Sequence, residues 1–246
     1  MFKFTETDLH VFASTLRGLV QPSSATSLVT HNRHRFLWKL PQAFASRLAE
    51  LYPTFLDASE THGRVRIEHW IDFPHAVLQH RNVVAFIHHG GANSFVEAGW
   101  CGIPQVILPQ WADCYDTAAQ AERLGLGVSN KDDADVPYLS VPVFTELLCT
   151  LLATEGAPVN GARPKSLYEH EKGAASQELT KGYEWYKKNA ERFAAECRLA
   201  GGAARAAKII EGVYAKELDE WDGPAPGEKC EDRQTAHREA APALSS

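Results

Sequence analysis

The sequence has 246 residues, 44% of them hydrophobic and 23% charged, and its formal net charge is −6 at pH 7. This composition is typical of a globular protein with one large or two small domains. The negative charge and the lack of a basic run argue against a general nucleic-acid surface, and no stretch approaches the roughly 18 apolar residues of a membrane span.

The first half of the chain predicts alternating helices and strands. A helix is expected from Thr7 or Asp8 to about Val20, and the segments that follow it are a strand at 35–40, a helix at 41–51, a strand at 65–70 and a short helix at 73–78. Further strands are expected at 83–88, 105–108 and 127–129, with helices at 93–100 and 114–124 between them. Such alternation is typical of a Rossmann-like, doubly wound parallel sheet, an α/β fold.

The rest of the chain predicts helices and then a tail. Helical spacing of apolar residues occurs at 141–153, 179–199 and 203–218. Residues 222–246 are rich in Pro, Gly, Glu and Ala without a periodic apolar face, so we expect a disordered tail there. We therefore expect one α/β domain over residues 1–221, followed by the tail.

Cysteine and histidine usage does not indicate a metal site. The five cysteines are scattered without a CxxC pair, and no zinc-like His/Cys spacing or HExxH sequence occurs. Reduced, mostly buried thiols are the simpler interpretation. The N-terminal sequence MFKFTETDLHVF also lacks the apolar core of a signal peptide, so we expect a cytoplasmic protein.

The most informative segment runs from Val83 to Pro109 and reads VVAFIHHGGANSFVEAGWCGIPQVILP. It predicts an apolar strand, a turn at Gly90 and Gly91, a short helix and a second apolar strand. The glycines let the backbone turn tightly and approach a ligand. The first amide groups of a helix have no partners within it, so this turn is a candidate site for a phosphate or another anion.

Side-chain donors and a carboxylate accompany this turn. His89, Asn93 and Ser94 lie at the expected start of the helix, and Glu97 follows Ser94 by three positions, on the same helix face. A Gly-Gly pair between a strand and a helix is by itself weak evidence, and each side chain could have a purely structural role. The order of the whole string is more specific.

The string resembles the signature of UDP-dependent glycosyltransferases of the GT-B type, in particular fungal-type sequences. In that family the C-terminal half carries a Trp, a His, a Gly-rich turn, Asn-Ser, a Glu, a Gly-x-Pro and an Asp-Gln pair. The resemblance runs from Trp70 to about Asp113, with looser similarity from near Leu9 to near Tyr214. It implies the C-terminal, donor-binding half of a GT-B fold.

The resemblance implies a role for each matching residue. The Trp stacks on uracil, the His and the turn bind the diphosphate, the Glu accepts the ribose hydroxyls, and the last residues contact the sugar. The matching donor-binding residues here are Trp70, His89, Gly90, Gly91, Asn93, Ser94, Glu97, Trp111 and Asp113.

Three positions depart from the family pattern. Phe73 stands where Gln is usual after the Trp, Ala92 where Trp is frequent, and Cys114 where the Asp-Gln pair has its Gln. These departures fall shortly after the expected uracil contact and at positions near the expected sugar contacts.

The resemblance implies inverting transfer of a hexose from a UDP-sugar to a hydroxyl of a small apolar acceptor, without a metal or other cofactor. The family places the acceptor pocket and the catalytic base in an N-terminal half that has no counterpart here. We therefore expect no catalytic residue in this chain, no activity by it alone, and a sheet lacking a central strand. A donor subunit that pairs with a separate acceptor subunit, or a non-catalytic nucleotide-sugar binding domain, remain alternatives.

Overall fold

The computed structural model describes residues 4–20, 34–55, 61–153 and 181–219. The chain divides into two compact units, residues 1–200 and residues 201–246. The second unit contains helix α9 (Gly202–Asp219). The tail expected at 222–246 lies outside the described residues. No helix in the described ranges is long and apolar enough to cross a membrane.

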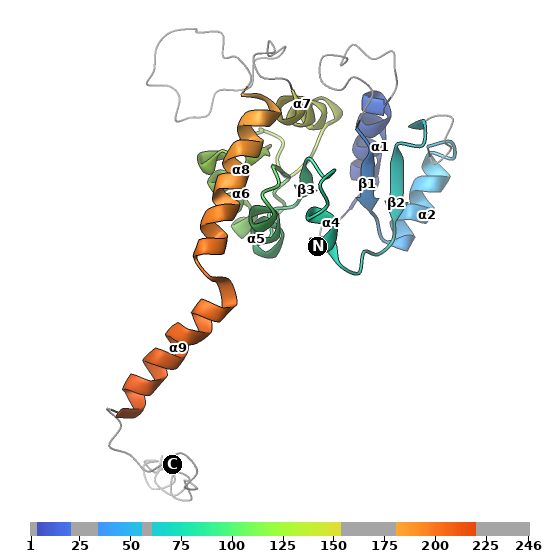
Figure 1. The fold of residues 1–246 in the computed structure, drawn as a ribbon. Helices are drawn as coiled ribbons and strands as arrows, with labels where there is room; N and C mark the ends of the chain where they lie inside the picture. The colour runs from blue at the N-terminus through green and yellow to red at the C-terminus, as the bar shows by residue number, and fades with distance from the viewer. Residues whose placement is uncertain (1–3, 21–33, 56–60, 154–180, 220–246) are drawn as a thin grey trace, which may run out of the picture. The chain divides into compact units, whose positions relative to one another are not determined.

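The first unit contains two parallel sheets (Figure 1). Strand β1 (Phe36–Lys39) pairs with β2 (Val65–Glu68). The other sheet has the order β3–β4–β5 and consists of β3 (Phe86–His88), β4 (Gln105–Ile107) and β5 (Gly127–Ser129). No described strand joins β1 to β3, so the described strands form two separate sheets. Strands β1 to β4 are shorter than the expected ranges and β5 has its expected range. The parallel direction of the strands confirms the α/β prediction.

Helices connect the strands. They are α1 (Glu6–Val20), α2 (Gln42–Leu51), α4 (Pro74–Leu78), α5 (Ala92–Cys101), α6 (Ala112–Leu124), α7 (Val141–Leu152) and α8 (Gly182–Leu199). Helix α1 begins before Thr7, because Thr5 and Asp8 cap it reciprocally. The Asp8 amide donates to Thr5 Oγ1 at 3.2 Å, and the Thr5 amide donates to Asp8 Oδ2 at 2.7 Å. The sequence prediction missed this capping box, in which Asp8 occupies the first helical turn.

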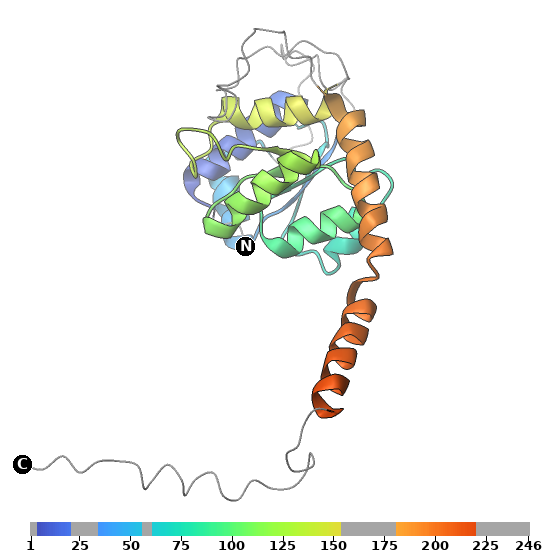
Figure 2. The same cartoon turned by 90° about the vertical axis from the view of Figure 1, so that its left-hand side faces the viewer.

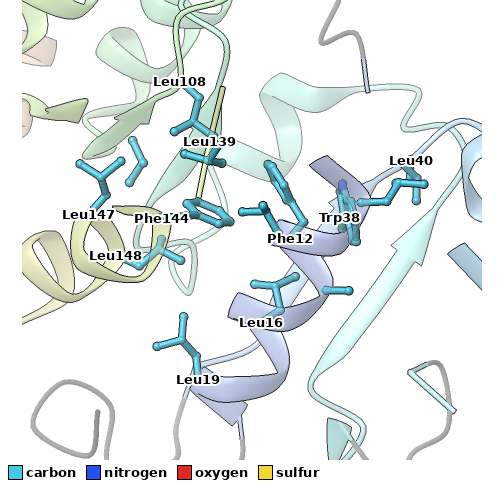
Figure 3. Packing of buried hydrophobic residues seen from close by; sticks show 14 of the residues in the cluster. Phe12, Leu16, Leu19, Trp38, Leu40, Leu108, Leu139, Phe144, Leu147 and Leu148 are labelled. Atoms are coloured by element: carbon cyan, nitrogen blue, oxygen red, sulfur yellow. The ribbon is translucent and has the colours of Figure 1, made fainter. Parts of the chain in front are cut away.

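One apolar core joins the two sheets (Figure 3). Phe12 of α1 stacks on Trp38 of β1, with ring centroids 5.2 Å apart, and contacts Phe144 of α7 at 4.6 Å. Helix α1 therefore lies between the β1–β2 sheet and α7. Aromatic contacts of this kind contribute beyond the area that they bury, so α1 connects the sheets without a hydrogen-bonded strand between them.

The two faces of the β3–β4–β5 sheet are covered by different helices, some of which are visible in Figure 2. Val106 of β4 packs in the core formed with α1 and α7, whereas its neighbour Ile107 packs with Ala118 of α6 and Ala190 of α8. Successive strand residues point to opposite faces, so α1 and α7 cover one face and α5, α6 and α8 the other. This double cover explains why β4 is an uninterrupted apolar run in the sequence.

Candidate functional site

The turn between β3 and α5 requires glycine at its first position. Gly90 has φ of 92°, a conformation that side chains with a Cβ rarely adopt. A Cβ there would also lie 2.9 Å from the backbone oxygen of Cys114. The Gly90 amide donates to Nδ1 of His88 at 3.0 Å. The turn is therefore fixed by a hydrogen bond to His88 of β3, and it packs closely against Cys114 at the start of α6.

The N-terminus of α5 is open to a ligand. Its N-cap residue is Gly91, and among the described residues no side chain forms a capping hydrogen bond there. Asn93 is exposed and Ser94 half-buried within that turn. Uncapped amides and the positive end of the helix dipole favour an anion at this place. The anion site predicted from the sequence thus has the backbone geometry that it needs.

His89 lies over the turn. A Cβ on Gly91 would be 2.7 Å from His89 Nε2, so the ring covers the second glycine closely. The ring also contacts that of Trp111, with centroids 5.2 Å apart. Burial lowers the pKa of His89, and the nearby charge of Asp113 opposes this shift. The imidazole is therefore neutral near pH 7 and offers one N–H donor beside the helix N-terminus.

His88 has a different environment from its neighbour. It is 6% exposed, and its Nε2 lies 2.8 Å from Oε1 of Gln105. Burial lowers its pKa to about 4, although the bond to Gln105 opposes the shift. Neighbouring residues of a strand face opposite sides of the sheet. His88 therefore lies buried beside Gln105, whereas His89 lies over the turn, as the sequence predicts.

Glu97 and Asp113 lie on the helices beside the turn. Glu97 is half-buried, about one helical turn beyond Asn93 and Ser94. Asp113 is exposed in the first turn of α6, which begins directly after Trp111. Carboxylates at these places can accept hydrogen bonds from hydroxyl groups of a ligand.

Trp70 lies on the other sheet, two residues after β2 ends. Its side chain is 64% exposed, and its Nε1 donates to Oδ1 of Asp72 at 3.0 Å. Lys39, at the end of β1, lies over the indole ring, with Nζ 4.1 Å from the ring centroid. Sequence reasoning missed Lys39 as a partner of Trp70, although its place at the carboxyl end of a parallel strand is a signal for a ligand-facing residue.

The structure thus brings together four of the predicted residues around the turn. His89, Gly91 and Trp111 are in contact, and Asp113 acts on His89 electrostatically. The contacts of Trp70 described above are with Lys39 and Asp72. Within the described residues, no group of three or more His, Cys, Asp or Glu side chains could hold a metal ion.

Comparisons with known proteins bear on the family and the fold of this chain. Residues 56–146 match the family "Erythromycin biosynthesis protein CIII-like, C-terminal domain". The glycosyltransferase sdnJ of Sordaria araneosa is 30% identical over 187 residues, which are 74% of this chain and 34% of that protein. The UDP-glycosyltransferase CGT of Oryza sativa subsp. indica is 37% identical over 101 residues, 39% of this chain and 21% of that protein. The chain thus spans about one third or less of these relatives.

Solved structures share the fold. UDP-glucose:anthocyanidin 3-O-glucosyltransferase in complex with UDP aligns with a TM-score of 0.60 at 18% identity, over 87% of this chain and 38% of that one. Os79 from O. sativa, in complex with UDP and deoxynivalenol-3-glucoside, aligns with a TM-score of 0.58 at 19% identity, over 87% of this chain and 40% of that one. The chain carries a glycosyltransferase C-terminal domain of the GT-B type. The family resemblance inferred from the HHGGANS string is thereby confirmed, while the role of each residue in this GT-B domain stays a prediction.

Proposed function

We propose that this GT-B domain binds a UDP-sugar at the carboxyl end of β3, as the donor-binding part of a transferase. The observation that carries the proposal is the uncapped N-terminus of α5 behind the Gly90–Gly91 turn, with His89 over it. Two solved structures with this fold were determined with UDP. A nucleoside diphosphate presents the anion that such a turn favours.

The diphosphate would lie against the turn and receive hydrogen bonds from the α5 amides, Asn93, Ser94 and the neutral His89. Negative charge builds on this group as the bond to the sugar breaks, so donors held in place stabilise the leaving group in the transition state. Glu97 would accept the ribose hydroxyls. Trp111 and Asp113 would face the sugar, and Trp70 would stack on the uracil.

The reaction that fits this site is transfer of a hexose from the UDP-sugar to a hydroxyl of a small apolar acceptor. The helix N-terminus would supply the charge stabilisation that a divalent cation provides in other transferases, so we propose that no metal is needed. We further propose that this chain alone binds UDP without turning over a UDP-sugar, because its candidate site contains donor contacts and no assigned base for the acceptor hydroxyl.

Titration calorimetry of the full chain with UDP tests the site. We expect His89→Ala and Glu97→Ala each to weaken binding by about tenfold, the effect of losing one hydrogen bond to a charged or multiply bonded ligand. His10→Ala on α1 and Glu196→Ala on α8 replace exposed residues of the same types and serve as controls. Equal affinity in the site variants and the controls would refute the assignment.

Two further measurements separate the parts of the proposal. UDP binding should be unchanged by EDTA, whereas its loss would show that a metal participates. UDP release from UDP-glucose with a hydroxyl acceptor should stay at the uncatalysed rate, and measurable turnover by this chain alone would contradict the proposed lack of a base. A donor subunit would acquire turnover when its acceptor partner is added, which a purely binding domain would not.

A further inference from the structure

The end of β1 holds a cation against the indole of Trp70. Lys39 is the last residue of β1 and pairs with Glu68, the last residue of β2. Trp70 follows Glu68 by two positions, so the register of the two strands brings the Lys39 side chain next to the indole. The Lys39 Nζ lies 4.1 Å from the ring centroid, well inside the roughly 6 Å at which an aromatic face attracts a cation.

The carboxylate that lies nearest to Lys39 in the strand pairing is already engaged. Arg66, on the same strand as Glu68, donates from its Nε to Glu68 Oε1 at 2.6 Å. The described interaction of the Lys39 ammonium is the one with the indole of Trp70. The cation–π contact therefore fixes both of these side chains.

A second contact fixes the edge of the same ring. Trp70 Nε1 donates to Oδ1 of Asp72 at 3.0 Å. The residue before Trp70 is tied to the end of β1, because His69 Nδ1 lies 3.3 Å from the carbonyl oxygen of Leu40. The indole is largely exposed, so burial does little to fix its orientation. One contact on a face and one at an edge define the plane of the ring instead.

The position of Lys39 leaves one face of the indole for a ligand. A base that stacked on the face beneath the ammonium would have to displace it, whereas the opposite face can take a planar base while the cation–π contact stays intact. A contact that holds a ring in its binding orientation raises the population of that orientation. It thereby raises the apparent affinity without touching the ligand.

We propose that Lys39 is a positioning residue of the donor site, which holds the Trp70 indole in the orientation that stacks on the nucleobase. This inference rests on the proposed function, in which Trp70 is the platform for the uracil. Lys39 precedes the segment from Trp70 to Asp113 that carries the family resemblance, and it acts through the ring.

Calorimetry of the full chain with UDP and with inorganic pyrophosphate tests the proposal. Lys39→Met removes the charge and keeps the length of the side chain. It should weaken UDP binding by about two- to fivefold, the factor that corresponds to an exposed cation–π contact, and leave pyrophosphate binding unaffected. Lys39→Arg keeps a cation over the ring and should restore the UDP affinity of the unaltered chain. Pyrophosphate binding also shows that each variant is folded.

The chain offers a matched control for this substitution. Lys181 lies over Trp185 of α8, with its Nζ 4.6 Å from the ring centroid, and neither residue is a predicted donor-binding residue. Lys181→Met removes the same charge and the same kind of contact, and it should leave the UDP affinity unchanged. In a Trp70→Ala background, Lys39→Met should have no further effect, because the ring through which it acts is absent.

The possible failures of this test are distinct. Equal losses of UDP and pyrophosphate affinity in Lys39→Met would identify a phosphate contact and overturn the positioning role. An undiminished effect of Lys39→Met in the Trp70→Ala background would show that the lysine contacts the ligand directly. Unchanged UDP affinity in Lys39→Met, together with a loss in Trp70→Ala, would refute this inference and leave the uracil platform intact. Unchanged UDP affinity in Trp70→Ala would refute the platform itself, and with it the role of Lys39.

Discussion

The two sheets of this domain differ in how completely they are covered. All residues of β4 and β5 are buried, and helices pack on both faces of that sheet. In β1 only Trp38 is buried, and β2 has no buried residue. The sheet that carries the Gly90–Gly91 turn is therefore packed on both faces, whereas the sheet that precedes Trp70 is much less buried.

This contrast has a consequence for ligand binding. The backbone groups proposed to hold the diphosphate are positioned before a ligand arrives, because Gly90 is closed against Cys114 and bonded to His88. The indole proposed to stack on the base is exposed, and its described contacts are with Lys39 and Asp72. Preorganised contacts cost less ordering on binding, so the diphosphate end should contribute most to affinity.

The largest expected effect is a loss of stability when a side chain at position 127 forces β5 away from β4. A Cβ on Gly127 would lie 1.9 Å from the backbone oxygen of Gln105 in the paired strand. Backbone cannot move aside as a side chain can, so Gly127→Ala should destabilise the domain by about 3 kcal/mol or more, the upper range for overpacking. Urea unfolding followed by far-UV circular dichroism measures this loss.

The control is the same substitution where space is available. Gly18 lies inside α1, and a Cβ there would meet nothing within 4 Å. Gly18→Ala should stabilise the domain by up to about 1 kcal/mol, because alanine is the better helix former. Equal unfolding midpoints for the two variants would show that β4 and β5 are not packed as closely as described.

The next effect is a pH dependence of stability that originates at His88, which bonds to the Gly90 amide in the Gly90–Gly91 turn. The pKa of His88 is lowered from 6.5 to about 4 by burial, so the unfolded chain takes up the proton first. The stability gained from a neutral His88 is therefore complete above about pH 6.5 and is lost as the pH falls toward 4, a change of about 3 kcal/mol. His88→Gln should flatten the unfolding free energy over this window.

Urea unfolding at several pH values between 4 and 7 measures that change. NMR titration of the His88 ring in the folded protein gives an independent readout, with no chemical-shift step expected above pH 5. A step near pH 6.5 would contradict the buried, neutral imidazole, and so would a His88→Gln variant with an unaltered pH profile.

The sequence predicted best those features that depend on neighbouring residues. The turn at Gly90, the opposite directions of His88 and His89 and the helix that begins beside Gly91 all follow from short-range geometry. Contacts between distant segments were missed. The position of Lys39 over Trp70 depends on the pairing of β1 with β2, which no local pattern at either residue signals.

The start of α1 and the connection between the two sheets show the same limit of prediction from local sequence. The capping pair Thr5 and Asp8 has a recognisable spacing, yet Thr7 was an equally acceptable cap in the sequence alone. Only the hydrogen bonds between Thr5 and Asp8 decide between them. The means by which α1 connects the two sheets, through Phe12, likewise required the structure.

The smallest expected effect on stability, and the sharpest test of the contrast between the sheets, is Trp70→Ala. Because the side chain is 64% exposed, its loss should change the free energy of unfolding by no more than about 0.5 kcal/mol. If the ring stacks on uracil, UDP affinity should fall by roughly fivefold to a hundredfold, since stacking contributes about 1–3 kcal/mol per base.

Calorimetry with UDP and with inorganic pyrophosphate separates the two ends of the ligand. Trp70→Ala should weaken UDP and leave pyrophosphate unaffected, whereas His89→Ala should weaken both. Equal losses for both ligands in Trp70→Ala would show that the indole supports the site as a whole and does not recognise the base.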